Sequence, residues 1–331
     1  MKYLVTGCAG FIGSHLTERL LQEGHEVVGI DNLSTGFEEY LPKKNENFTF
    51  LKLDIFDWNS LTKHINYFKD VKCVFHLAAC ARIQPSIYSP SLTHDTNVTG
   101  TINILEIMRA LNINQIVYSA SSSYYGLKAN IPSKETDPCD CQTPYSASKY
   151  MGELYCSTWS KIYKINSIRL RYFNVWGPRS PTSGNYAPVI SLFFRQALLE
   201  ESPMTVVGDG QQRRDFTHVD DVVSANIAAH KYMLLNSQTC IDKVYNIGTG
   251  KNYSILDIAN MVKSSVEELK LQKHSFCKIK CNIVHISKRI GEAELSLADN
   301  SAAEKEIFWK PKESLQTMLS KLRDYYLNKE K

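Results

Sequence analysis

The sequence contains no apolar run approaching the ~18 residues that a membrane-spanning helix needs. It turns polar and glycine-rich at Thr6 and Gly7, before the apolar stretch of a signal peptide could form. The net charge of +4 comes from scattered side chains and is too small to indicate a nucleic-acid groove. The nine cysteines are odd in number and widely spread, which fits reduced thiols better than a disulfide framework. These absences predict a cytoplasmic protein with neither a membrane nor a nucleic-acid partner.

The first half of the 331-residue chain alternates short apolar runs with longer amphipathic stretches, and it contains no internal repeat. The runs of strand length are Lys2–Thr6, Glu26–Asp31, Phe48–Leu53, Cys73–Leu77, Ile116–Ser121 and Ile165–Tyr172. Helices are predicted from about Gly13 to Glu23, Asp95 to Leu111 and Tyr145 to Ile162. Continuous apolar strands separated by helices are typical of a parallel sheet covered on both faces, so the predicted fold is a Rossmann-type, doubly wound α/β fold.

The regular alternation of strand-like and helical segments ends at the loop of residues 177–184, which is rich in Gly, Pro and Ser. Beyond it we predict helices at Val189–Glu200, Asp220–Leu235 and Leu315–Lys331, and a strand at Asn282–Ile286. We therefore expect a smaller α/β lobe built on the larger one.

The motif Gly7-x-x-Gly10-x-x-Gly13 lies between the first strand and the first helix. Glycines there let the backbone turn tightly and approach a pyrophosphate, which then lies at the positive end of the helix. Asp31 ends the second strand, where a carboxylate accepts hydrogen bonds from the adenosine ribose and repels a 2′-phosphate. Glycine clusters are common in loops, but this position in the unit favours dinucleotide binding, with NAD preferred over NADP.

Tyr145 and Lys149 are four residues apart, so on a helix they share one face. A nearby ammonium stabilises a phenolate and lowers the pKa of the tyrosine, which would make it a general base. This spacing is also frequent by chance on exposed helices. Upstream, residues 119–123 read Ser-Ala-Ser-Ser-Ser at the carboxyl end of a predicted strand, and they could relay a proton or simply form a turn.

Three other patterns in the sequence are interpreted as having no function. His274, Cys277, Cys281 and His285 fall within twelve residues, but their spacing matches no compact zinc loop, so we predict no metal. Cys139 and Cys141 have no companion ligands in the sequence and are interpreted as inert loop thiols. Asn97-Val98-Thr99 matches a glycosylation sequon, which we expect to be unused.

Together these elements resemble the extended short-chain dehydrogenase/reductases, of the NAD-dependent nucleotide-sugar epimerase/dehydratase type. The resemblance runs nearly from end to end of the chain. Besides the features above, it rests on Asp54-Ile55, FHLAA (75–79), RYFNVWGPR (171–179), GDG (208–210), RRDF (213–216), VYNIG (244–248) and RIGE (289–292).

The resemblance implies roles for residues at matching positions. It implies that the catalytic residues are Ser121, Tyr145 and Lys149. It implies that NAD is held by Gly7, Gly10, Phe11, Ile12, Gly13, Asp31, Asn32, Asp54, Ile55, Leu77, Ala78, Ala79, Ser119, Tyr145, Lys149 and Tyr172. It implies that a UDP-sugar substrate is held by Ser122, Ser123, Asn174, Val189, Arg214, Arg289 and Ser296.

The reaction is implied by the residues just before the Tyr-Gly pair. Dehydratases of this family carry Thr-Asp-Glu there, whereas residues 121–123 here are serines with no carboxylate. The resemblance thus implies a 4-epimerase: Tyr145 takes the proton of the 4-hydroxyl, hydride passes to NAD, and a 4-keto sugar rotates before reduction.

The substrate implied is UDP-N-acetylglucosamine/UDP-N-acetylgalactosamine, with UDP-glucose/UDP-galactose as a further pair, because Ser296 leaves room for an acetamide. Arg82 and Ser180 depart from the expected pattern, so the exact sugar stays open. The alternatives are a 4,6-dehydratase or decarboxylase, or a catalytically silent NAD-binding scaffold.

The predicted NAD domain comprises residues 1–174 and about 217–247, and the sugar-nucleotide lobe comprises about 175–216 and 248–331. The helices predicted at 95–111 and 145–162 carry apolar residues on more than one face, so one face can cover the sheet and the other can meet a second copy. As in the family generally, we expect a homodimer.

Overall fold

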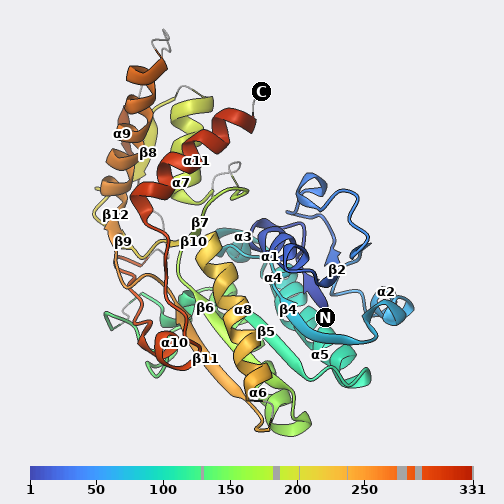
Figure 1. Ribbon diagram of the computed structural model, residues 1–331. Helices are drawn as coiled ribbons and strands as arrows, with labels where there is room; N and C mark the ends of the chain where they lie inside the picture. The colour runs from blue at the N-terminus through green and yellow to red at the C-terminus, as the bar shows by residue number, and fades with distance from the viewer. Residues whose placement is uncertain are drawn as a thin grey trace.

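A seven-stranded parallel sheet forms the centre of the computed structural model, which describes residues 1–127, 130–181, 187–200, 202–236, 238–273, 282–287 and 293–329 (Figure 1). The sheet order is β11-β6-β5-β4-β1-β2-β3. Its strands are β1 (Lys2–Thr6), β2 (Glu26–Asp31), β3 (Phe48–Lys52), β4 (Val71–His76), β5 (Gln115–Ser121), β6 (Asn166–Tyr172) and β11 (Asp242–Ile247). The chain winds outward in both directions from β1, so the strand order reverses between β1 and β4. The doubly wound prediction is confirmed, and this reversal is where such sheets bind ligands.

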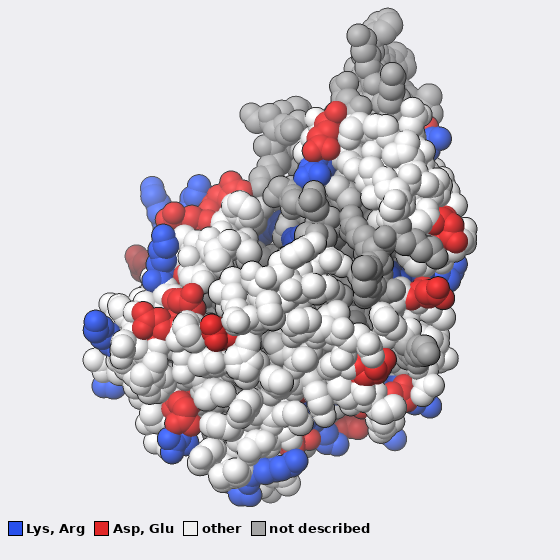
Figure 2. Space-filling view, turned by 180° about the vertical axis from the view of Figure 1, so that it is seen from behind, with Lys and Arg blue, Asp and Glu red and all other residues white. Residues whose placement is uncertain are grey.

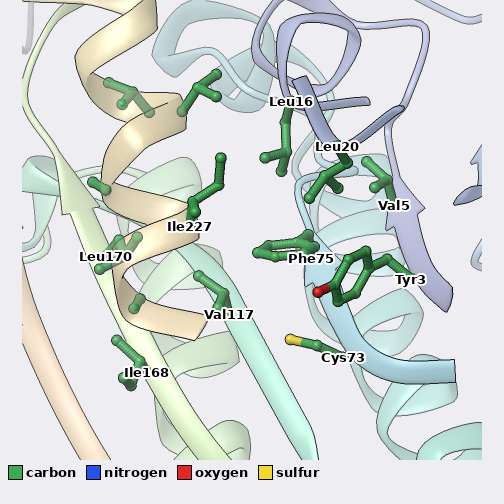
Figure 3. Close-up of a cluster of buried hydrophobic side chains, with 14 of the residues drawn as sticks. Tyr3, Val5, Leu16, Leu20, Cys73, Phe75, Val117, Ile168, Leu170 and Ile227 are labelled. Atoms are coloured by element: carbon green, nitrogen blue, oxygen red, sulfur yellow. The ribbon is translucent and has the colours of Figure 1, made fainter. Parts of the chain in front are cut away.

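Helices cover both faces of the sheet because its inner strands are buried on both sides. The helices α1 (Phe11–Gln22) and α8 (Val219–Leu235) pack on one face, where side chains from β1, β2, β4, β5, β6, β11 and both helices form one cluster, part of which Figure 3 shows. The helices α5 (Gly100–Ala110) and α6 (Pro144–Tyr163) pack on the other. The residues labelled in Figure 3 are Tyr3, Val5, Leu16, Leu20, Cys73, Phe75, Val117, Ile168, Leu170 and Ile227.

A second cluster lies beyond the carboxyl ends of the strands, around α7 (Val189–Phe194), α9 (Ile255–Lys273) and α11 (Leu315–Lys329) (Figure 1). The strands β8 (Met204–Val207) and β13 (Ile283–Ile286) pair beneath these helices. Two further strand pairs link the lobes: β7 (Val175–Trp176) with β10 (Thr217–His218), and β9 (Arg213–Arg214) with β12 (Tyr253–Ser254). The helix α9 has no counterpart in the sequence-based prediction.

The helix α10 (Ser301–Glu306) belongs by packing to the sheet rather than to this second cluster. Its Ala303, with Ile307 and Trp309 just after it, is part of the core formed by α1 and α8. The predicted division of the chain puts all of residues 248–331 in the smaller lobe. We propose that α10 be counted with the NAD domain.

Two predicted helices begin or end in a wide, π-helical turn. The helix predicted at Asp95–Leu111 starts with such a turn over Asp95–Thr99, and the one at Val189–Glu200 ends with one over Arg195–Leu199. Apolar spacing finds the helix in both cases but cannot reveal the extra residue in the turn.

The remaining elements connect the larger ones. They are the short helices α2 (Trp58–Lys63), α3 (Ile83–Tyr88) and α4 (Pro90–His94), and the single turns Glu38–Tyr40, Ile65–Phe68 and Ser122–Tyr125. Among the residues that the structure describes, no helix has both the length and the apolarity needed to cross a membrane. In the view from behind, Lys and Arg are interspersed with Asp and Glu and are sparse over the middle of the face (Figure 2).

Candidate active site

The glycine-rich turn between β1 and α1 is fixed by contacts within the protein. Gly7 has φ of +74°, and a Cβ there would lie 2.8 Å from the Ala78 amide nitrogen. A Cβ on Gly13 would lie 2.0 Å from the Gly7 carbonyl oxygen, and one on Gly10 would lie 3.2 Å from the same atom. These contacts within the protein itself require glycine at Gly7 and Gly13, and the approach of this turn to a pyrophosphate stays a prediction.

The amino end of α1 is ready for an anion. Gly10 is its N-cap and has no side chain to satisfy the first amides, and the first turn holds no acidic residue. The first helical hydrogen bond runs from the Ser14 amide to the Gly10 carbonyl, 3.0 Å away, so the amides of Phe11, Ile12 and Gly13 precede the helical ladder. These three donors and the helix dipole suit a pyrophosphate.

Asp31 lies beside this turn at the end of β2 and is 8% exposed. One carboxylate oxygen accepts from the Ala9 amide at 3.0 Å, and the other accepts from the Leu33 amide at 2.8 Å. Each oxygen keeps a lone pair for a ribose hydroxyl. Burial raises the pKa of the Asp31 carboxyl, and the backbone amides oppose that shift.

Asn32 and Asp54 are joined across the neighbouring strand ends. The Asn32 amide donates to Asp54 at 2.9 Å, and Asp54 also accepts from the Phe56 amide at 2.9 Å. Ile55 is buried against Gly100 of α5, where a Cβ would come within 2.7 Å of its side chain. Asn32 and Asp54 thus follow the carboxyl ends of β2 and β3, at the same edge of the sheet as Asp31.

Thr6 organises the turn that follows β4. Its hydroxyl accepts from the amides of Leu77 and Ala78, at 3.1 Å each, and lies 2.7 Å from Nδ1 of His76. Ala79 completes this turn, and Gly7 packs against it at Ala78. The turn and the glycine-rich loop thus hold each other in place.

The predicted catalytic tyrosine begins helix α6. Thr143 caps the helix, exchanging hydrogen bonds with Ser146, and Pro144 takes the first helical position, which explains why the helix starts here. The Tyr145 amide donates to the Ser86 hydroxyl of α3 at 3.0 Å. Burial raises the pKa of Tyr145, and a hydrogen bond with Ser121 opposes this shift. The predicted lowering of this pKa is therefore wrong for the protein by itself, because burial of the phenol is the largest effect.

Lys149 lies one turn further along the same face and is 4% exposed. Its ammonium is 4.6 Å from the centre of the Tyr118 ring, a cation–π contact with β5. Burial lowers the pKa of Lys149 to about 8, so the side chain remains mostly charged at neutral pH.

The serines at the end of β5 face α6. Ser121 accepts from the Ser123 amide at 3.2 Å and from the Ser123 hydroxyl at 2.9 Å, and it pairs with Tyr145. Ser122 starts the turn after β5. The predicted catalytic trio of Ser121, Tyr145 and Lys149 therefore meets at one edge of the sheet, although it comes from two separate elements.

Ser119 and Tyr172 also meet, at the ends of β5 and β6. The Tyr172 hydroxyl is hydrogen-bonded to Ser119 and lies 3.0 Å from the Asn226 amide oxygen in α8. Both predicted cofactor residues thus lie on neighbouring strands, between the sheet and the helix that covers it.

Two of the predicted substrate residues lie side by side. Ser296 donates its amide to the Arg213 carbonyl at 3.0 Å, next to Arg214 in β9. Asn174 follows β6, and its amide donates to the Asp215 carbonyl at 3.2 Å. Val189 is the first residue of α7, partly buried against the second-lobe core. Arg289 lies outside the described residues.

Sequence reasoning missed Asn97. Its side-chain oxygen accepts from the Cys80 backbone amide at 2.7 Å, and its side-chain nitrogen donates to the Cys80 carbonyl at 3.1 Å. The same nitrogen donates to the Ser148 hydroxyl at 2.9 Å. Ser148 in turn donates to the Tyr145 carbonyl at 2.8 Å, so Asn97 ties the wide turn before α5 to the start of α6. The sequence shows Asn97 only as part of a sequon that we expect to be unused, and its neighbours Thr96 and Val98 give no signal of these partners.

The structure describes one of the four residues that make up the zinc alternative. His285 lies in β13, exposed, with Nδ1 2.7 Å from the Gly208 carbonyl. The other three residues of that cluster lie outside the described residues. Within the described ranges, no group of three or more possible ligands could hold a metal ion. Cys139 and Cys141 are reduced, with their sulfur atoms 3.3 Å apart.

The arrangement fits a dinucleotide followed by a hydroxyl-bearing substrate. It offers an anion site at the amino end of α1 and the Asp31 carboxylate for a ribose. It also offers the Tyr145 phenol, with the Lys149 ammonium one helical turn away and the Ser121 hydroxyl hydrogen-bonded to it. Such a site can remove a proton from a substrate alcohol while the cofactor exchanges hydride with the same carbon.

Comparison with known proteins agrees with this geometry. The family model described as GDP-mannose 4,6 dehydratase matches residues 4–322. The UDP-glucose 4-epimerase of Thermotoga maritima, solved with UDP-glucose, is 30% identical with a TM-score of 0.89, and the match covers 100% of both chains.

Two further structures match over nearly the whole chain. The UDP-N-acetylglucosamine 4-epimerase of Methanobrevibacter ruminantium, in complex with UDP-N-acetylmuramic acid, is 31% identical with a TM-score of 0.87, covering 99% of this chain and 98% of that one. The UDP-glucose 4-epimerase of Thermus thermophilus, in complex with NAD, is 29% identical with a TM-score of 0.85, covering 99% of each chain.

Proposed function

Since the chain belongs to the extended short-chain dehydrogenase/reductase family of nucleotide-sugar epimerases and dehydratases, we propose that it is an NAD-dependent 4-epimerase of a UDP-hexose. The observation that carries the proposal is the hydrogen bond between Tyr145 and Ser121, with Lys149 one helical turn further on, at the carboxyl end of β5 and two strands from the glycine-rich turn that follows β1. NAD, when bound, supplies the hydride acceptor and donor.

The residues of the chain perform the proton chemistry. Tyr145 takes the proton of the sugar 4-hydroxyl and later returns it. Ser121 bridges the tyrosine and the sugar oxygen, because its hydroxyl already pairs with Tyr145. Lys149 would stabilise the phenolate and hold the nicotinamide ribose, because its ammonium is a buried cation one helical turn from Tyr145.

An epimerase is favoured over a dehydratase by the turn after β5. Elimination of water needs carboxyl side chains beside the sugar, and residues 121–123 offer only hydroxyls. A catalytically silent scaffold is disfavoured because Tyr145 and Lys149 are both present and share the face that meets Ser121.

The proposed substrates are UDP-N-acetylglucosamine/UDP-N-acetylgalactosamine first and UDP-glucose/UDP-galactose second. Two observations support this order: Ser296, a small side chain, lies beside Arg213 and Arg214, and an N-acetylated UDP-sugar is the substrate named for one structural relative. The test is incubation with a panel of UDP-sugars, with products resolved by NMR and Tyr145→Phe as the control. Epimerisation at C4 of none of the panel would refute the proposal.

We further propose that the protein is a homodimer through α5 and α6. The outer face of α6 carries Met151, Leu154 and Ile162, which are 40%, 48% and 62% exposed and recur at helical spacing. The helices α5 and α6 cover the sheet face turned toward the viewer in Figure 2, where charged side chains are sparse at the centre.

The dimer is tested by light scattering coupled to size exclusion. Leu154→Glu should yield a monomer, because it puts a charge into the centre of an apolar contact. The matched control is Leu235→Glu, since Leu235 is 82% exposed at the end of α8 on the other face. A monomeric wild-type protein would overturn this assignment.

A further inference from the structure

Glu153 of α6 and Arg171 of β6 form an ion pair in the interior of the protein. They are 5% and 3% exposed. The Arg171 Nη2 lies 2.8 Å from one carboxylate oxygen, and its Nε lies 3.0 Å and 3.3 Å from the two. Burying such a pair costs as much desolvation as its attraction returns, so stability alone does not explain it.

The arginine reaches the turn that carries the serines. Its guanidinium carbon lies 3.4 Å from the centre of the Tyr124 ring, and its Nη1 donates to the Tyr125 hydroxyl at 3.1 Å. Both tyrosines belong to the turn Ser122–Tyr125, directly after Ser121. Arg171 therefore contacts the turn that directly follows Ser121.

The same arginine is linked toward the predicted substrate segment. The Tyr125 hydroxyl donates to the Asn246 side chain at 2.6 Å, and the Asn246 amide donates to the carbonyls of Ser133 and Asp299 at 2.8 and 3.2 Å. Asp299 lies three residues after Ser296. The pair thus sits at the junction of β5, β6, β11 and the 294–299 segment.

Glu153 lies on the same face of α6 as the predicted catalytic residues Tyr145 and Lys149. Glu153 is four residues after Lys149, so one helical turn separates them on the buried face of α6. The titratable or charged groups that face Lys149 are His76 of β4, Tyr118 of β5, Tyr145, Glu153 and Cys156 of α6, and, behind Glu153, Arg171 of β6. Arg171 in turn faces Tyr124, Tyr125 and Glu135, and all three stay in place in the variants proposed below.

We propose that Glu153 and Arg171 are positioning residues for catalysis: they fix the rotation of α6 against the serine turn, and their two charges balance each other at the Tyr145–Lys149 pair. This inference rests on the proposed epimerase function and assigns neither residue a contact with substrate or cofactor.

The two charges act in opposite directions on the catalytic pair. Without the Glu153 carboxylate, the remaining guanidinium disfavours the Lys149 ammonium and favours the Tyr145 phenolate, so both groups titrate at lower pH. Without the guanidinium, the remaining carboxylate moves both titrations to higher pH. Two charges ~6 Å apart at an effective dielectric constant of ~20 shift a titration by at most about 2 units, and screening makes about 0.5 to 1 unit the expected shift.

The experiment compares kcat/KM as a function of pH for wild type, Glu153→Gln, Arg171→Met and the double variant. The proposal predicts that both limbs of the profile move to lower pH in Glu153→Gln, to higher pH in Arg171→Met, and back to within about 0.3 units of wild type in the double variant. A role in folding alone predicts lower activity in both single variants with unmoved limbs.

A second readout needs neither substrate nor cofactor. The phenolate of Tyr145 can be titrated by near-ultraviolet difference absorbance, taking each protein against the same protein carrying Tyr145→Phe. The Tyr145 titration should move with the activity limbs, down in Glu153→Gln and up in Arg171→Met.

Asp242→Asn provides the matched control. Asp242 pairs with Arg169, which lies on the same strand as Arg171, so this variant also breaks a partly buried ion pair of β6. Its melting temperature should fall while its pH limbs stay in place.

The outcomes separate the two claims. Wild-type protein that epimerises no UDP-sugar refutes the proposed function, whereas an active wild type whose limbs and Tyr145 titration stay fixed in both single variants overturns the positioning role. If either single variant fails to fold, Glu153→Asp decides, because its shorter carboxylate should move the limbs down by a smaller, measurable amount. No movement there would also overturn the role.

Discussion

Replacement of Asp31 by Asn should remove most of the preference for NAD over NADP. The Asp31 carboxylate cannot swing away from a 2′-phosphate, because its two oxygens are held by the amides of Ala9 and Leu33 at 3.0 and 2.8 Å. Two unit charges at ~4 Å repel by about 4 kcal/mol at an effective dielectric constant of ~20. The wild type should therefore bind NAD at least ~10³-fold more tightly than NADP.

The Asn side chain keeps one acceptor and loses the charge. Asp31→Asn should weaken NAD binding by about tenfold, the usual loss for a hydrogen bond to a charged group, and strengthen NADP binding by ~10²-fold. Calorimetry with both dinucleotides measures the ratio, and Asp57→Asn, at the exposed N-cap of α2, is the control. Comparable binding of NAD and NADP by the wild type would refute the role given to Asp31.

Four further changes have definite expected outcomes. Tyr145→Phe should lower kcat by ~10²–10⁴-fold while NAD binding, followed by calorimetry, stays nearly intact; turnover within a few-fold of wild type would exclude the general-base role. Ser296→Tyr should fill the space for an acetamide and shift the ratio of kcat/KM values by roughly 5- to 150-fold toward UDP-glucose, whereas an unchanged ratio would remove Ser296 from the sugar site. Gly152→Ala should lower both the melting temperature and kcat, because the new Cβ would lie 2.0 Å from the Tyr118 hydroxyl oxygen; an unchanged melting curve would contradict this packing. Burial lowers the pKa of His76 to about 3, so unfolding takes up a proton below pH ~6.5 and stability falls as the pH drops. His76 alone should account for a loss of about 2 kcal/mol between pH 7 and pH 5, in addition to the losses from His218 and His230, whose pKa values burial lowers to about 4. Thermal melts at pH 7 and 5 should therefore show a loss that is about 2 kcal/mol smaller in His76→Asn than in the wild type.

The first β-α-β unit was predicted almost to the residue because local signals agree there. Lys2–Thr6 and Glu26–Asp31 are apolar, β-rich and bounded by glycine or turn residues, so no distant contact is needed to define them. The start of α6 is similar, since Thr143, Pro144 and Ser146 cap the helix locally.

What escaped prediction depends on contacts between distant segments. The role of Asn97 requires Cys80 and Ser148, 17 and 51 residues away, and nothing near Asn97 signals either partner. Likewise, the direction of the Tyr145 pKa shift depends on how deeply the fold buries the phenol, which spacing along a helix cannot give.

The mutual packing of the glycine-rich turn has a thermodynamic consequence for binding. Because Gly7 and Gly13 touch each other and Ala78 through the protein's own backbone, the turn has its shape before any ligand arrives. A dinucleotide then loses little free energy to ordering the loop, and its affinity reflects the contacts themselves. We expect the association rate of the dinucleotide to be independent of motion in this turn. A slow dissociation of the dinucleotide would then reflect the strength of its contacts and not a slow opening of the turn.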